Sequence, residues 1–281
     1  MFKKTQLIAI LFVFLNFFIS TASFAYDRFA KVVIIGQIGS GKTVLYNLLT
    51  HSNKGINDTT HTKQISTNKM EYNIDDNSIC VYLNDTPGEV GYKNLVNAFC
   101  HNANVVFITV DAVDFVRVKM NYRGKINHLD DITDNLENLI GELYKYNPNC
   151  RVVVVMTKMG MIGAIYEHEN SKKWKVVQSS LKHYIEDLSY IEDNVDETYD
   201  LTLFDTKSKE AIDHRTKLEN IIKECLRKYG IDKLPDTPDE FRAEIVKKIA
   251  GYKKVVDEEA GTCSSEKSHI ETKYENKLYV K

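Results

Sequence analysis

Residues 31–43 of the chain read Lys-Val-Val-Ile-Ile-Gly-Gln-Ile-Gly-Ser-Gly-Lys-Thr, an apolar run followed by a glycine-rich turn. The β-branched run is typical of a buried strand. The turn matches the pattern G-x-x-x-x-G-K-[ST] in full, and apolar residues at helical spacing follow it. Glycines let backbone N–H groups approach phosphate oxygens, and a helix N-terminus adds partial positive charge. The sequence therefore predicts a nucleotide-phosphate site formed by Gly36, Gly39, Ser40, Gly41, Lys42 and Thr43, in which Lys42 reaches the outer phosphates and the Thr43 hydroxyl binds Mg²⁺.

Further apolar runs alternate with helical patterns along the chain. This alternation predicts an α/β domain with a mostly parallel central sheet. Together with the glycine-rich motif, the predicted order of elements resembles the three-layer P-loop NTPase fold. In such sheets, ligands bind at the carboxyl ends of the strands. A hairpin turn is predicted at Asp75–Asn77. The expected strands are 31–36, 70–74, 79–83, 104–110, 152–156 and 201–204, and the expected helices are 44–49, 95–100, 126–146, 172–188 and 218–230.

A second motif, Asp85-Thr86-Pro87-Gly88-Glu89, follows an apolar strand. An Asp at a strand end can hold Mg²⁺, usually through water. A glycine three residues later lets a backbone N–H approach a terminal phosphate. A plain surface turn is the alternative reading of this motif alone. Its spacing after the phosphate loop favours Asp85 as a metal ligand and Gly88 as part of the nucleotide site.

Together with Tyr72–Asn77 and Ala103–Asp111, these motifs resemble the Ras/Rab-like small GTPases in content and order. The resemblance covers about residues 29–230, the size of one domain. It implies that the protein binds GTP and GDP, takes Mg²⁺ as cofactor, and acts as a molecular switch. In such a switch, two loops are held by the γ-phosphate and released on hydrolysis.

The resemblance also implies roles for two loop residues. Thr62 falls where the family keeps an Mg²⁺-binding Thr, and an ordinary loop Thr is the other reading. Glu89 takes the position of the Gln that orients the attacking water. Because a carboxylate beside a phosphate is electrostatically unfavourable, we expect slow hydrolysis, with Glu89 and Lys42 as the catalytic residues. Rivals for the role of Thr62 are Thr59, Thr60 and Thr67.

The base-recognition motifs depart from the family. Thr157-Lys158-Met159-Gly160 resembles [N/T]-K-x-D, in which the Lys stem stacks on the base, but Gly160 replaces the Asp that pairs with guanine. Losing that pair lowers the expected guanine preference by roughly ten- to a hundred-fold. Thr206-Lys207-Ser208 resembles the loop whose backbone meets the base, and a charged helix start is its alternative reading. Ile38 replaces a small residue and could obstruct a partner's arginine finger.

Three functions fit these motifs. The first is a GTP-binding switch with slow GTPase activity, served by effector, exchange-factor and GAP proteins. The second is a pseudo-GTPase scaffold that has lost hydrolysis or base selection. The third is an ATP-binding P-loop NTPase. The net charge of −2 gives no reason to expect nucleic-acid binding.

The flanking segments differ from the central domain. Residues 1–25 carry a basic start and an apolar run, which predicts a signal peptide or an N-terminal membrane anchor. Residues 231–258 are expected to form a helical extension, and the helix within it is expected to start at Thr237 as N-cap. The polar tail 259–281 is expected to be disordered.

Cysteine usage bears on the compartment of the mature domain. The 5 cysteines show no close pair, and most fall in apolar runs, which favours free core thiols and a reducing compartment. A glycosylation sequon at Asn84 would place a glycan against the nucleotide site. The N-terminal segment, by contrast, indicates membrane association or secretion.

Overall fold

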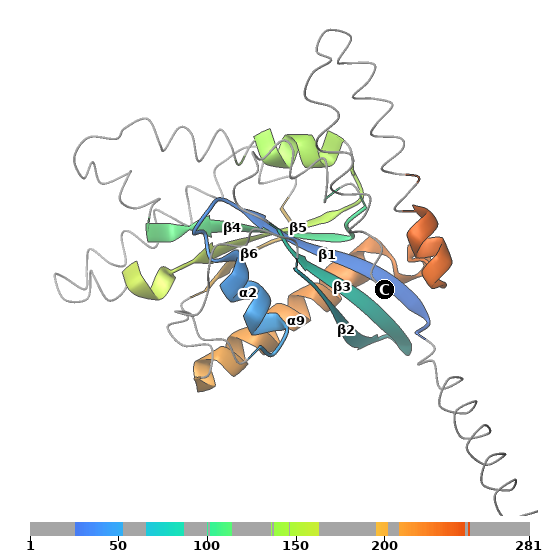
Figure 1. Ribbon diagram of the computed structural model, residues 1–281, viewed down its shortest axis with the longest axis horizontal. Coiled ribbons are helices and arrows are strands. Elements are labelled where there is room, and N and C mark those ends of the chain that lie inside the picture. Colours follow the sequence, from blue (N-terminus) through green and yellow to red (C-terminus); the bar gives the residue numbers. More distant parts are fainter. Residues whose placement is uncertain are drawn as a thin grey trace, which may run out of the picture.

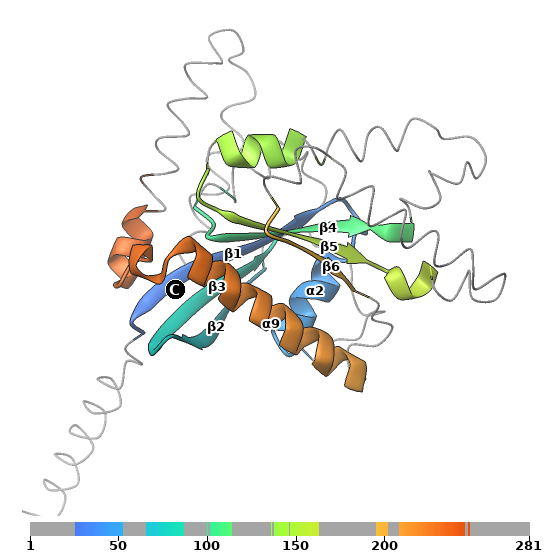
Figure 2. The same ribbon diagram turned by 180° about the vertical axis from the view of Figure 1, so that it is seen from behind.

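The computed structural model describes residues 26–52, 66–86, 100, 102–113, 136, 138–145, 147–162, 195–201, 208–244 and 247. Figures 1 and 2 show these residues as coloured ribbons from opposite sides. The predicted segments 1–25 and 259–281 lie outside the described residues, as does the helix expected at 172–188.

A six-stranded sheet forms the centre of the fold, in the order β2-β3-β1-β4-β5-β6. β2 is antiparallel to β3, and the other neighbouring pairs are parallel. The carboxyl ends of β1, β3, β4, β5 and β6 therefore lie along one edge, called here the carboxyl edge. The strands are β1 (Arg28–Gly36), β2 (Ser66–Ile74), β3 (Asn77–Asp85), β4 (Val105–Asp111), β5 (Arg151–Thr157) and β6 (Glu197–Asp200).

Helices cover both faces of this sheet. On one face lie α2 (Lys42–Leu49) and α9 (Lys209–Tyr229), side by side in Figures 1 and 2. Alternate residues of the strands, such as Val32 and Phe107, join these two helices in one core cluster. The other alternate residues, such as Val33, pack with the helical segment 138–145 in a second cluster. These two cores give the three layers of a P-loop NTPase fold, which confirms the predicted fold class.

The first five predicted strands are confirmed, and most are longer than predicted. The hairpin between β2 and β3 turns at Asp75 and Asp76, with φ of +48° and +66°. Asp tolerates this left-handed region better than most side chains do, which explains why the polar pair marks the turn. The predicted helical end at Gly230 is also confirmed, since α9 stops there with glycine at φ +100°.

The last strand was predicted at 201–204, but Leu201 follows a strand rather than belonging to one, and residues 202–204 lie outside the described residues. β6 lies at Glu197–Asp200 and pairs with β5, with Val153 opposite Glu197 and Met156 opposite Asp200. Leu201 adds one more hydrogen bond, from its N–H to the Met156 oxygen at 2.8 Å. β6 is an edge strand with partly exposed residues, so its sequence lacks the apolar run that marked the other strands.

The C-terminal extension docks on the start of β1. After η3 (Ile231–Lys233), a helix begins at Pro238, and the Thr237 hydroxyl accepts a hydrogen bond from the Glu240 N–H at 3.1 Å. This contact confirms Thr237 as an N-cap. Phe241 stacks on Tyr82 of β3, with ring centroids 5.1 Å apart, and also packs against Phe29. We call Phe29, Tyr82 and Phe241 the aromatic clasp.

Two general features complete the fold. Four cysteines, Cys80, Cys100, Cys150 and Cys225, are free and buried, as predicted for core thiols. Within the described ranges, no helix combines the length and hydropathy that a bilayer crossing requires.

Candidate functional site

The glycine-rich loop connects β1 to α2 at the carboxyl edge. Gly41 is the N-cap of α2, with φ of +86°, and Gly39 has φ of +76°. Both angles favour glycine because, at a positive φ, a Cβ atom would come too close to the carbonyl oxygen of the adjacent peptide group. At Gly36, a Cβ atom would stand 2.2 Å from the Thr109 hydroxyl. The glycines of the motif therefore allow both the turn and its close approach to β4.

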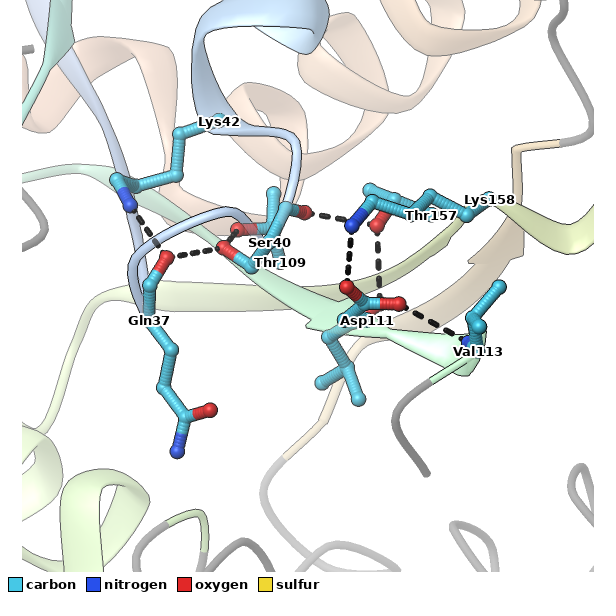
Figure 3. Close-up of polar contacts among 9 residues, drawn as sticks. Gln37, Ser40, Lys42, Thr109, Asp111, Val113, Thr157 and Lys158 are labelled. Carbon is cyan, nitrogen blue, oxygen red and sulfur yellow. Dashed lines mark hydrogen bonds and ion pairs between the residues drawn. The ribbon is translucent and has the colours of Figure 1, made fainter. Parts of the chain in front are cut away.

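The side chain of Ser40 points into the sheet. Its hydroxyl lies 2.7 Å from the Thr109 hydroxyl and donates to the Gln37 oxygen at 2.8 Å. Thr109 is also within hydrogen-bonding distance of the Ile35 oxygen, at 3.1 Å. The Ser40 hydroxyl therefore fixes the phosphate loop to β4 (Figure 3), so only the backbone of Ser40 is left for the predicted contact with phosphate. The sequence motif did not predict the part played by Thr109.

Lys42 folds back over the loop. Its ammonium group donates to the Gly36 oxygen at 2.9 Å and to the Gln37 oxygen at 2.7 Å, and only 5% of the residue is exposed. Burial lowers the pKa of Lys42 to about 8, and the nearby Asp85 carboxylate opposes this shift. The Lys42 ammonium therefore lies inside the loop, where two carbonyl oxygens accept its hydrogen bonds in place of the predicted phosphate oxygens.

Thr43 and Asp85 meet beneath the loop. The Thr43 hydroxyl donates to Asp85 Oδ2 at 3.0 Å, although the two residues are 42 positions apart. The neighbouring Thr86 hydroxyl donates to the Ile34 oxygen at 2.8 Å, which fixes the end of β3 against β1. A hydroxyl and a carboxylate are hard oxygen ligands of the kind that Mg²⁺ takes. The residues present thus fit the predicted metal.

Thr157 joins the end of β5 to the same loop. Its hydroxyl lies 2.7 Å from the Ser40 oxygen and 3.1 Å from the Val110 oxygen. A Cβ atom on Gly41 would stand 3.1 Å from the Thr157 side chain. The Thr of the predicted base-recognition motif is therefore buried against the phosphate loop.

Lys158 follows with a left-handed backbone, at φ of +60°. Its ammonium forms an ion pair with Asp111 at the end of β4, and the Asp111 carboxylate also accepts from the Val113 N–H at 3.0 Å (Figure 3). Met159 and Gly160 begin a short helical turn. The sequence motifs gave Asp111 no role. Only its position at the carboxyl end of a buried strand could have marked it as a candidate site residue.

The other predicted residues are not all placed together. Ser208 is the N-cap of α9, and its hydroxyl accepts from the Ala211 N–H at 3.1 Å, in line with the alternative reading of a helix start. Outside the described residues lie Thr62, Gly88, Glu89, Thr206 and Lys207. The structure thus brings together Gly36, Gly39, Ser40, Gly41, Lys42, Thr43, Asp85, Thr157 and Lys158 at the carboxyl edge.

A glycine-rich loop between a strand and a helix, with Thr43 against Asp85, defines the class of P-loop proteins. Residues 31–160 match the family described as "Roc: Ras of Complex, Roc, domain of DAPkinase". Ras of Complex is a small-GTPase family of the P-loop superfamily, so this match confirms the resemblance predicted from the motifs.

One similar solved structure is titled "Structure of methanosarcina barkeri Roco2 RocCORdC bound to GDP", with 15% sequence identity and a TM-score of 0.45. The match covers 83% of this chain, which spans only 66% of the length of that chain. No curated protein matches the chain.

Proposed function

We propose that this protein binds GTP and GDP at the carboxyl edge, with Mg²⁺, and acts as a nucleotide-dependent switch. The observation that carries the proposal is the convergence of Lys42, Thr43 and Asp85 at the phosphate loop. They supply one cation and two oxygen ligands beneath backbone N–H groups, as binding of a magnesium nucleotide requires. The small-GTPase family of residues 31–160 supports guanine nucleotide as the ligand.

The residues divide the work of binding. Lys42 can exchange its two carbonyl partners for phosphate oxygens, since both partners belong to the loop itself. The Thr43 hydroxyl and the Asp85 carboxylate would hold Mg²⁺, with Thr62 as the expected further ligand. Bound Mg²⁺ would neutralise charge on the phosphates. The loops around Thr62 and Gly88 would then respond to the γ-phosphate.

Hydrolysis is proposed to be slow. Glu89 stands where Ras-like proteins carry a Gln, and a carboxylate there would repel the phosphates it must approach. Ile38 is 53% exposed on the phosphate loop, where a partner that donates an arginine would have to pass. Both features favour a long-lived GTP complex.

Calorimetric titration of the full chain with GTP, GDP and ATP in Mg²⁺ tests the proposal. We expect guanine nucleotides to bind and Lys42→Ala to abolish binding, because the mutant lacks the cation in the loop. Lys217→Ala is the matched control, since Lys217 is exposed on α9. Normal GTP affinity in Lys42→Ala would contradict the proposal. Equal affinity of the wild-type chain for ATP and GTP would favour an ATP-binding NTPase.

A pseudo-GTPase scaffold is the second candidate, and Gly160 favours it. Without an Asp at that position, the short turn at 159–162 offers no carboxylate to guanine. Single-turnover measurement of phosphate release separates the two candidates. Release at the usual small-GTPase rate would exclude the scaffold, and tight binding without release would support it.

We propose a reducing compartment for the mature domain. Four buried free thiols support it, as does Asn84, whose side-chain amide is buried and donates to the Tyr82 oxygen at 3.2 Å. A glycan on Asn84 would have to displace this packing. The segment 1–25 is proposed as the membrane tether. Alkaline extraction that leaves the whole chain soluble, with this segment attached, would contradict the tether.

A further inference from the structure

The carboxyl end of β4 carries an acidic side chain that no motif assigned to the site. Asp111 lies opposite Thr157 in the sheet, and its Oδ2 forms an ion pair with the Lys158 ammonium. Its Oδ1 accepts a hydrogen bond from the Val113 N–H at 3.0 Å, which sets the direction of the carboxylate. Asp111 thus fixes the far end of a long and otherwise flexible side chain (Figure 3).

The near end of Lys158 is fixed as well. The Thr157 hydroxyl lies 2.7 Å from the Ser40 oxygen, so the residue before Lys158 is bound to the phosphate loop. Lys158 itself has φ of +60°. Residues other than glycine rarely adopt this conformation, and when they do it is often at functional sites. The stem of Lys158 is therefore held at both ends, between the loop and β4.

We propose that Asp111 is a positioning residue for the nucleotide base, acting through Lys158. The inference rests on the proposed function, namely that the adjacent loop binds nucleotide phosphates. With its ammonium anchored on Asp111, Lys158 presents a four-carbon apolar stem beside the phosphate loop, on which a base can stack. Anchoring removes the rotamer entropy that a free lysine would lose on binding.

The ion pair also bears on base choice. The charge of Asp111 is balanced by Lys158, and Gly160 has no side chain, so this surface offers apolar contact in place of a guanine-specific acceptor. Stacking on the stem is available to either purine. Asp111 should therefore strengthen the binding of guanine and adenine nucleotides by similar factors.

The test compares ligands with and without a base. The full chain and Asp111→Asn are titrated with GDP, ADP and inorganic triphosphate in Mg²⁺. Asparagine keeps an acceptor for the Val113 N–H but loses the charge that holds Lys158. We expect both nucleotides to bind about ten-fold more weakly, with triphosphate affinity unchanged, because the phosphate loop is intact. Asp111→Glu should restore part of the lost affinity.

Asp196→Asn is the matched control. Asp196 and Asp111 side chains are both 11% exposed, and Asp196 pairs with Arg151 at the opposite end of β5. This variant loses a similar ion pair far from the carboxyl edge, so its nucleotide affinity should stay at the wild-type value.

The outcomes are distinguishable. Unchanged GDP affinity in Asp111→Asn would overturn the inference, as would an equal loss for inorganic triphosphate, which would indicate a disturbed loop. Failure of the wild-type chain to bind any of the three ligands would instead remove the proposed function itself.

Discussion

The buried ammonium of Lys42 links nucleotide binding to pH. Its pKa of about 8 in the free protein lies below the ordinary value because burial disfavours the charged form. Nearby phosphates would raise this pKa again, so binding above about pH 8 must draw a proton from solution. We expect affinity for GDP to fall as the pH rises above about 8. Near pH 7 Lys42 is already charged, and binding should take up almost no proton.

Calorimetry in two buffers of different ionisation enthalpy measures this proton uptake. The expected result is close to one proton per GDP at about pH 9 and much less at about pH 7. Equal proton uptake at both pH values would mean that Lys42 in the free protein does not lose its proton between about pH 7 and about pH 9. The comparison needs GDP with saturating Mg²⁺, so that the nucleotide itself does not titrate.

Two glycines of the loop are expected to tolerate alanine differently. At Gly36, a Cβ atom would stand 2.2 Å from the Thr109 hydroxyl, whereas at Gly39 nothing lies within 4 Å. Gly36→Ala should therefore lower the free energy of unfolding by about 1–3 kcal/mol more than Gly39→Ala does, because it adds overpacking to backbone strain. Urea denaturation of both variants measures the difference. Equal midpoints would mean that β4 moves away at little cost.

The residues of the candidate site that belong to sequence motifs were predictable, and those that reach it through the sheet were not. Lys42, Thr43 and Asp85 follow from spacing along the chain. Thr109 and Asp111 could be assigned only once β4 is placed between β1 and β5. Thr109 contacts β1 and the phosphate loop, and Asp111 pairs with Lys158, directly after β5. Strand order and register thus limit what a sequence reveals about a site of this kind.

Among the elements, β6 shows the same limit. Strands in the middle of the sheet are buried on both faces and produce the apolar runs from which β1, β3, β4 and β5 were predicted. β6 pairs on one side, and its sequence Glu-Thr-Tyr-Asp gives no such run. The apolar residues just after it led to the prediction at 201–204, of which only Leu201 is described. Tertiary pairing with β5 settles the position instead.

The aromatic clasp fixes the C-terminal helix to the sheet, and Phe241→Ala tests its strength. Phe241 is buried against Phe29 and Tyr82, so its loss should lower the free energy of unfolding by about 3 kcal/mol. Arg242→Ala is the matched control, since that side chain is 70% exposed and should change stability little. Urea denaturation measures both. Equal stability in the two variants would mean that the helix contributes nothing to the fold.

For the whole molecule, the class of fold and the edge that carries the site followed from the sequence alone. The parallel order of β3, β1, β4 and β5 places the phosphate loop, Asp85 and Lys158 along a single edge. The sequence could not show that the C-terminal extension returns to β1, because this contact depends on aromatic side chains that also suit a free amphipathic helix.

Ligand binding should stabilise the whole domain. GDP with Mg²⁺ at about 100 times its Kd is expected to add about 2.7 kcal/mol to the free energy of unfolding, since it binds the folded state alone. For a domain of this size the melting temperature should rise by roughly 5–10 °C. Thermal unfolding with and without GDP measures the shift. A shift of the same size in Lys42→Ala would place the ligand elsewhere.

The clasp has a mechanical consequence. The Phe29 N–H donates to the Pro235 oxygen at 2.8 Å, so the two ends of the domain leave it side by side at the start of β1. The phosphate loop lies at the other end of that nine-residue strand, about 26 Å away. Force applied to both ends would act on this hydrogen bond and on the aromatic clasp before it reached the carboxyl edge. The C-terminal segment that holds Pro235 and Phe241 should therefore detach first, while the carboxyl edge, one strand length away, stays folded.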